Sequence, residues 1–236
     1  CTRLSRITIP GKVRQLGPSA FADCANLASL VISDGVTNIT YRAFCNQGSL
    51  KSVMIAGSVA VIEGLAFAGC SGLTNVTMGN GVAIIESGAF AGCSKLASLT
   101  IPSSVKRIDP GAFVQCGSLA TVYFMGNAPR LSQGVFDAGS KAIVYYLPRT
   151  TGWGPTLGSL TTRLLSTGAL ASASSAMREP PSTGAATKDE EELLSRAQRG
   201  EAQAQYVLGL RYEGGSGVPR RHPEAAGARA GPTRRR

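Results

Sequence analysis

The sequence predicts a repeat solenoid in which short coils stack on one another through parallel strands, and three observations support this fold class. Phenylalanine recurs every 23 residues without a slip. Apolar residues six, nine, eleven, fifteen and eighteen positions after the first five of these phenylalanines keep the same period. A unit of this length cannot bury a core by itself, so neighbouring coils have to cover its apolar side. The residues that define the period are Phe21, Phe44, Phe67, Phe90, Phe113 and Phe136.

Each coil is predicted to contribute one short strand. In the second coil, Leu27, Leu30 and Ile32 are apolar, and the last two alternate with outward residues as in a strand with one buried face. The outward residues of successive coils then form one flat or concave surface. These outward pairs are Arg6/Thr8, Ser29/Val31, Ser52/Met54, Asn75/Thr77, Ser98/Thr100 and Thr121/Tyr123.

The corner of each coil carries an Ala-Phe pair after a turn, and this corner is predicted to be a short helical or 3₁₀ segment. The segment Asp109-Pro110-Gly111 is typical of such a start, with an acidic N-cap followed by Pro at the first helical position.

The combination of this period with the Leu position, the strand pair and Ala-Phe-x-x-Cys resembles the BspA-like branch of the leucine-rich repeat family over residues 1 to about 165. The resemblance implies a parallel-strand leucine-rich repeat solenoid. Residues 142–148, with Gly152-Trp153-Gly154 after them, look like the terminal strand and aromatic cap that close such arrays. We interpret Trp153 as a cap over apolar edges and not as a ligand anchor.

Cysteines occupy one repeated place in successive coils, three residues after the repeat Phe, and Gln47 takes that place in the third coil. We interpret these thiols as groups that fill a small buried corner and bond weakly to loop backbone. Disulfides between coils are a less favoured alternative, because the series has an odd number of members and a gap. Closely spaced Cys-x-x-Cys pairs of the metal-binding type are absent. Cys45, outside the series, is the candidate for a reactive thiol. The series consists of Cys1, Cys24, Cys70, Cys93 and Cys116.

The composition changes after the solenoid. Residues 166–188 are rich in Ala, Ser, Thr, Gly and Pro, which predicts a flexible, disordered linker. Helix signals return in residues 189–226, which Thr187 and Glu190 introduce as a capping-box pair. Residues 227–236 are predicted to be a disordered basic tail.

The segment 189–226 is similar to a Sel-one-like repeat, a helical hairpin related to the tetratricopeptide repeat. The resemblance implies only a partial repeat, because Gly, Ala and Arg replace the expected second helix from Gly227 onward. The matching residues are Ala204, Leu208, Gly209, Tyr212, Gly215, Gly217, Val218, Pro219 and Ala225.

Composition argues against several function classes. The chain has 24 Lys and Arg against 14 Asp and Glu, a net charge of +10, but the basic residues of the solenoid are scattered, and few coincide with aromatic positions. A specific nucleic-acid site is therefore not predicted. The one histidine, His222, lies in the C-terminal segment, and no phosphate-binding motif is present, so neither an enzyme nor a cofactor site is predicted. No apolar run reaches the roughly 20 residues of a membrane span.

Three acids, Glu63, Glu86 and Asp109, each stand 19 residues after a repeat Phe and are predicted to stack as a column with carboxylates about 5 Å apart. We favour a capping role, in which each acid binds the N–H groups of the short helix that leads to its own Phe. Two alternatives stay open, a divalent-cation site and a carboxylate pair of the kind that retaining glycosidases use.

The outward strand surface is the candidate binding site. Our first hypothesis is a non-catalytic protein-interaction module whose partner is a protein of unknown identity, with Met54 and Tyr123 as main contacts. The resemblance to BspA-like proteins implies the alternative, a secreted or cell-surface adhesin or antigen. On that route Asn38 and Asn75, both in Asn-x-Thr patterns, would carry glycans. The candidate face is Thr8, Val31, Met54, Thr77, Thr100 and Tyr123.

An intracellular location is favoured over export. The chain starts at Cys1, in the middle of a coil, which keeps an upstream targeting segment and the exported alternative open.

Overall fold

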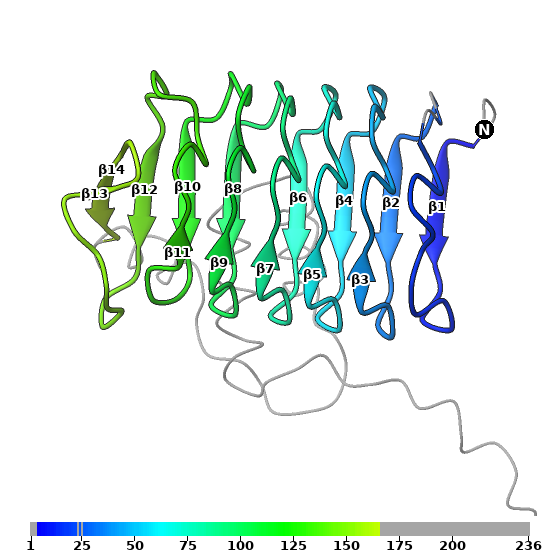
Figure 1. Ribbon diagram of the computed structural model, residues 1–236, viewed down its shortest axis with the longest axis horizontal. Coiled ribbons are helices and arrows are strands. Elements are labelled where there is room, and N and C mark those ends of the chain that lie inside the picture. The colour runs from blue at the N-terminus through cyan, green and yellow to red at the C-terminus, as the bar shows by residue number, and fades with distance from the viewer. Residues whose placement is uncertain (1–3, 23, 25, 166–236) are drawn as a thin grey trace, which may run out of the picture.

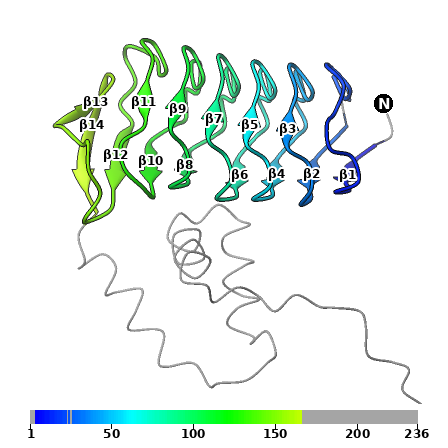
Figure 2. The same ribbon diagram turned by 60° about the horizontal axis from the view of Figure 1, so that its bottom comes forward.

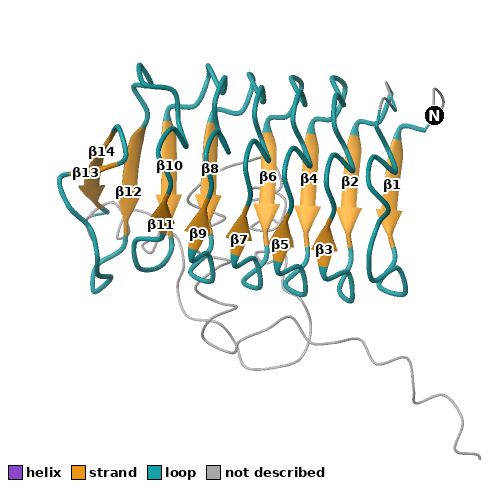
Figure 3. Cartoon of the chain, viewed as in Figure 1, coloured by secondary structure: helices purple, strands orange, loops and turns teal. Residues whose placement is uncertain are grey.

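A computed structural model of the protein describes residues 4–22, 24 and 26–165. These residues form a stack of coils without a helix (Figure 3), which confirms the predicted parallel-strand solenoid. The predicted linker, partial helical repeat and tail lie outside the described residues. Within the described residues, nothing forms a helix with the length and apolarity that crossing a membrane requires.

Most coils contribute two strands, one more than the sequence predicts. The long strands lie side by side in Figure 1, and Figure 2 shows the short strands in a second row. The long strands are β1 (Arg6–Ile9), β2 (Ser29–Ile32), β4 (Ser52–Ile55), β6 (Asn75–Met78), β8 (Ser98–Ile101), β10 (Thr121–Phe124) and β12 (Ile143–Tyr146). The short strands are β3 (Asn38–Ile39), β5 (Val61–Ile62), β7 (Ile84–Ile85), β9 (Arg107–Ile108) and β11 (Arg130–Leu131).

All pairings between successive coils are parallel, and the short strands form one continuous sheet from β3 to β11. The long strands form two ladders. One is β1-β2-β4-β6, and the other is β8-β10-β12, which β14 (Leu160–Leu164) and then β13 (Thr156–Leu157) extend at the C-terminal end. Strands β6 and β8 lie side by side (Figure 1) but share no ladder. The two rows of strands enclose the core between them.

The core consists of the repeated apolar residues. The repeat phenylalanines stack face to face, with ring centroids 5.1–5.6 Å apart along the whole series. Phe44, Phe67 and Phe90 are fully buried, whereas Phe21 at the N-terminal end of the stack is only partly buried. Stacked aromatic rings and buried aliphatic rows thus hold each coil to the next.

The corners are turns, so the predicted helical or 3₁₀ segment is wrong. The residue two positions before each repeat Phe has left-handed backbone, including Arg42 (φ 56°), Leu65 (φ 57°) and Gly111 (φ 69°). A left-handed residue cannot continue a right-handed helix. In addition, the N–H of Phe44 donates to the carbonyl of Ala66 in the next coil (2.9 Å), where a helix would direct it backward within its own segment.

The C-terminal end has an extra hairpin that the sequence analysis missed. The segment Ile143–Tyr146 is a strand, as predicted, but it is not the last one. Strand β14 (Leu160–Leu164) pairs with it in parallel, and β13 (Thr156–Leu157) pairs antiparallel with β14. The hairpin of β13 and β14 therefore closes this end of the long sheet.

Trp153 has the structural role that the sequence predicts. Its ring packs edge-on against Phe124, with centroids 5.2 Å apart, and stacks on Tyr146 at 4.8 Å. Its Nε1 donates to Thr150 Oγ1 at 2.9 Å. The indole therefore packs against the last coils of the solenoid and has its polar atom satisfied internally.

Candidate functional site

The predicted face exists as a row of outward side chains on the long strands. Strand pairing sets Thr8, Val31, Met54 and Thr77 opposite one another in successive coils. It likewise sets Thr100 opposite Tyr123. These residues are exposed or half-buried, while their neighbours along each strand point into the core. That this row binds a partner stays a prediction.

Tyr145 extends the row and was missed by the sequence analysis. It pairs with Tyr123, and the two rings stack at 5.4 Å with an interplanar angle of 19°. Arg163 on β14 lies opposite Tyr145. The period shortens to 22 residues here, because Thr121 pairs with Ile143. Counting 23 residues from Tyr123 therefore selects Tyr146 instead of Tyr145. The alternation of inward and outward residues within the strand itself identifies Tyr145 as the outward one.

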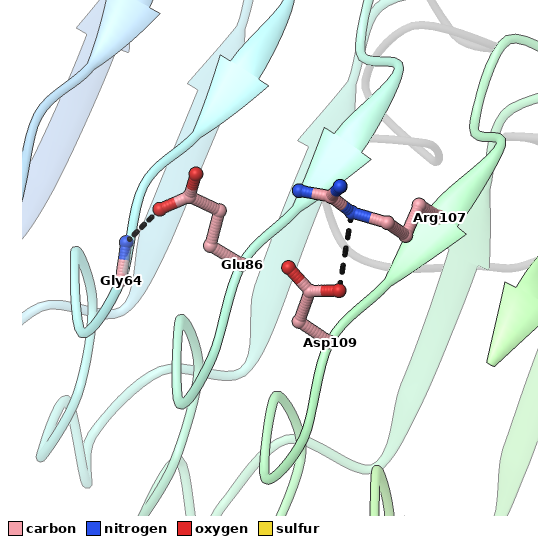
Figure 4. A network of polar contacts seen from close by, with 4 residues as sticks. All are labelled: Gly64, Glu86, Arg107 and Asp109. Atoms are coloured by element: carbon pink, nitrogen blue, oxygen red, sulfur yellow. Dashed lines mark hydrogen bonds and ion pairs between the residues drawn. The ribbon is translucent and has the colours of Figure 1, made fainter. Parts of the chain in front are cut away.

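The acid column binds backbone N–H groups, but in a different way from the prediction. Glu86 Oε2 accepts a hydrogen bond from the N–H of Gly64 at 3.0 Å (Figure 4). Glu63 Oε2 accepts one from Tyr41 at 2.9 Å. Both donors belong to the turn of the preceding coil, so each glutamate joins two coils and does not cap a helix before its own Phe.

Asp109 departs from the glutamates. Its Oδ1 lies 3.1 Å from Nε of Arg107, which is two residues earlier in the chain, at the start of β9 (Figure 4). Aspartate is one methylene shorter than glutamate, which fits this local contact in place of a reach to the preceding coil. In the part of the chain that the structure describes, no three His, Cys, Asp or Glu side chains form a group that could hold a metal ion. The geometry therefore favours a structural role for the column.

The buried cysteine series has the predicted form. The thiols of Cys70, Cys93 and Cys116 donate to the repeat-Phe carbonyl of the preceding coil at 3.2–3.4 Å. Gln47 keeps the same bond from its Nε2 to the carbonyl of Phe21. The cysteines from Cys24 to Cys116 are free and buried, which excludes disulfides among them. Cys1 lies outside the described residues.

Burial also changes the acidity of these thiols. Loss of solvation raises the pKa of Cys70 to about 12 and that of Cys116 to about 11, and it raises the pKa of Cys93 as well. Cys45, the predicted reactive thiol, is also buried, with 8% of its surface exposed. Cys70, Cys93 and Cys116 are therefore poor nucleophiles, because they are buried and their raised pKa values keep them protonated. Burial also limits the access of reagents to the Cys45 thiol.

The Cys70 thiol is expected to make the fold less stable at high pH. The pKa of a cysteine thiol is about 8.5 in an unfolded chain. In the folded protein the pKa of Cys70 is about 12. Between these values the unfolded state holds fewer protons, so the free energy of unfolding falls as pH rises. Urea unfolding at about pH 8 and about pH 10.5 measures this fall. Cys70→Ala should show a smaller fall, and an equal fall in both proteins would contradict the assignment.

The described residues thus define a parallel-strand repeat solenoid with one broad strand face. The chain matches the family model "BspA type Leucine rich repeat region (6 copies)" over residues 1–120 and 37–148. It belongs to the BspA-type leucine-rich repeat family, as the sequence resemblance implies. No curated protein has a sequence that matches this chain significantly.

Solved structures of leucine-rich repeat proteins have a similar fold. The T. pallidum leucine-rich repeat protein TpLRR is 20% identical, with a TM-score of 0.50 over 62% of this chain and 75% of that protein. A leucine-rich repeat protein from Bacteroides ovatus ATCC 8483 is 26% identical, with a TM-score of 0.54 over 68% of this chain and 43% of that protein. The chain therefore spans less than half of the B. ovatus protein.

Proposed function

We propose that this protein is a non-catalytic interaction module that binds a partner protein on the outward face of its long strands. The observation that carries the proposal is the stacked pair Tyr123 and Tyr145, which lies on the same row as Met54 and Val31. Tyrosine is enriched among the few residues that carry most of the energy of protein interfaces, and methionine is frequent at adaptable binding surfaces. A rigid solenoid also presents such residues with little loss of conformational entropy on binding.

The long-strand face suits this role better than the short-strand face. Long strands of four residues place two outward side chains per coil on the surface, whereas the two-residue short strands place one there. The short-strand side also carries Glu63 and Glu86, whose carboxylates are engaged in bonds between coils. Substitution on that side can therefore serve as a matched control for the long-strand face.

The non-catalytic part of the proposal rests on the functional groups. The acids of the column contact backbone N–H groups or an arginine, and burial holds the repeated thiols in their protonated form. General acid-base and nucleophilic catalysis need titratable groups that converge on a substrate. His222, the one histidine of the chain, lies outside the described residues.

The alternative is a secreted or cell-surface adhesin or antigen of the BspA-like type. One feature of that alternative, glycan attachment, receives little support from the side-chain positions. Asn75 is buried in β6 with 7% of its surface exposed. Asn38 lies on β3, and its Nδ2 donates to Glu63 Oε1 at 3.3 Å. A glycan on Asn75 would have no room in the folded coil.

The test is affinity capture with the full chain as bait, in parallel from a cell lysate and from an extracellular preparation. The double variant Met54→Asp/Tyr123→Asp should lose the partner, with Kd raised roughly thirtyfold or more, as for the loss of about 2 kcal/mol at a binding centre. The control Val61→Asp/Ile84→Asp places the same charges on the paired outward positions of the short strands. It should retain the partner.

A partner that binds the long-strand variant normally, or is lost equally with the control, would contradict the proposal. The thermal transition of both variants has to stay near that of the parent, so that loss of binding reports the surface and not unfolding. Capture from the extracellular preparation alone would favour the adhesin alternative.

A further inference from the structure

Backbone bonds at the corners run in one direction along the solenoid. In the coil of Phe44, three N–H groups donate to carbonyls of the next coil: Arg42 to Gly64 (3.1 Å), Phe44 to Ala66 (2.9 Å) and Asn46 to Ala68 (2.7 Å). The coils of Phe67 and Phe90 repeat the same three bonds. Each of these three corners therefore presents three donors, two residues apart, to the corner that follows it.

The sixth corner presents these donors without an acceptor. Its equivalent N–H groups belong to Gly134, Phe136 and Ala138, and none of them donates to another described residue. The reason is the changed path of the chain, which enters β12 and then the hairpin of β13 and β14 without forming another corner. A Cβ atom built on Gly134 would accordingly meet nothing within 4 Å.

A pocket of about 480 Å³ lies at this corner. The short sheet ends at β11, while the long sheet continues to β12 and β14 (Figures 1 and 2), so the pocket occupies the place that a further coil would fill. We call it the end notch. The residues of the end notch used below are Leu131, Gly134, Phe136, Ala138, Gly158 and Ser159.

The donors of the end notch suit a peptide backbone better than a compact anion. They repeat at every second residue, and in the corners of Phe44, Phe67 and Phe90 each meets a separate carbonyl of one chain segment. In the corner of Phe113 two donors meet carbonyls, and the third, the N–H of Gln115, donates to the carboxylate of Asp137. No charged side chain lines the pocket. A phosphate would be expected to need convergent donors or a cationic partner. A peptide segment, by contrast, offers carbonyls at the required spacing, as in strand addition to an open sheet edge.

The five earlier contacts between corners also define the side chains that fit. The carbonyl above the repeat Phe belongs to alanine in most coils, and Ala66, Ala89 and Ala112 are fully buried there. The residue after each alanine is the next repeat Phe, whose ring stacks on the one below. At the end notch no further repeat ring stacks on Phe136 among the described residues, but other side chains cover the ring, which keeps 5% of its surface exposed.

We propose that the end notch binds an extended segment of a partner protein in which alanine is followed by an aromatic residue. Its carbonyls would accept the N–H groups of Gly134, Phe136 and Ala138, and its aromatic ring would enter the pocket that Leu131 and Phe136 line. This interface continues the contact that the chain already makes between its own coils. The site is separate from the long-strand face, and the proposal does not depend on the function proposed for that face.

The probe is a fluorescent peptide with the sequence of residues 86–92, Glu-Ser-Gly-Ala-Phe-Ala-Gly, titrated with the full chain by anisotropy. We expect saturable one-to-one binding that is lost when the phenylalanine of the peptide is replaced by aspartate. Ser159→Trp should fill the pocket and weaken binding at least about tenfold. The matched control, Ser118→Trp, changes an exposed serine that does not line the pocket and should bind normally.

Three results would overturn the proposal: no saturable binding, equal affinity of Ser159→Trp and the parent protein, or displacement of the peptide by inorganic phosphate. The last would assign the donors to an anion site. The Met54→Asp/Tyr123→Asp variant should bind the peptide like the parent, which separates this site from the long-strand face. A thermal melt of each tryptophan variant shows whether the fold is retained.

Discussion

Replacing Phe67 with alanine is expected to lower the free energy of unfolding by about 3–5 kcal/mol. The ring is fully buried and lies between Phe44 and Phe90, with centroids 5.5 and 5.1 Å away. Its removal would take away both stacking contacts and leave a cavity in the middle of the solenoid. Neighbouring coils are bonded above and below, so they cannot collapse to fill it. Urea unfolding followed by circular dichroism measures the loss.

The control for this prediction is the same substitution at Phe21. That ring stacks on one side only, on Phe44 at 5.3 Å, and is partly exposed. Phe21→Ala should therefore cost clearly less, because part of the ring is already in water and one stacking contact is lost instead of two. Equal losses at the two positions would show that the stack does not contribute as a continuous column.

Replacing Gly81 with valine is expected to lower the free energy of unfolding by about 3 kcal/mol or more. A Cβ atom on Gly81 would lie 1.7 Å from the carbonyl oxygen of Gly57 in the preceding coil. This contact is with backbone, which cannot rotate away as a flexible side chain can. The turn between β6 and β7 would therefore have to separate from the coil before it.

Ser104→Val is the matched control, because Ser104 stands 23 residues after Gly81, at the same place in the next coil. A Cβ is already accommodated there, and the substitution removes the hydrogen bond from Ser104 Oγ to the carbonyl of Val82 (2.8 Å). That loss should cost only about 1 kcal/mol. If Gly81→Val is no more destabilising than Ser104→Val, the close approach of the two turns is not a constraint on the fold.

The inward pattern was predictable because burial repeats with the period of the sequence. Leu30, Val53 and Leu99 occupy the same position in their coils, and all three are buried. Each faces the core at that position, so each has to be apolar. The cysteine series was predictable on the same grounds, because a small group with a weak donor suits a tight interior corner. The candidate face follows from the same alternation, since residues between inward positions have to point outward.

The second row of strands was harder to infer. Each has only two residues, such as Val61–Ile62, and one inward position is too short to show an alternation. The corners were misassigned because Ala-Phe after Asp-Pro is also typical of a helix start. Glycine normally marks a position with left-handed backbone, but Arg42 and Leu65 adopt this conformation without being glycine. Their conformation therefore depends on contacts between coils and could not be read from the sequence.

The solenoid, its period and its buried residues follow from the sequence alone, because a fixed apolar period is satisfied by stacking similar coils on one another. Tertiary structure decided where Glu63 and Glu86 find their donors, how Tyr145 joins Tyr123, and where the end notch lies. These features depend on which groups of neighbouring coils come into register. Register is a property of the stack and not of any single repeat, so it is settled only when the coils pack against one another.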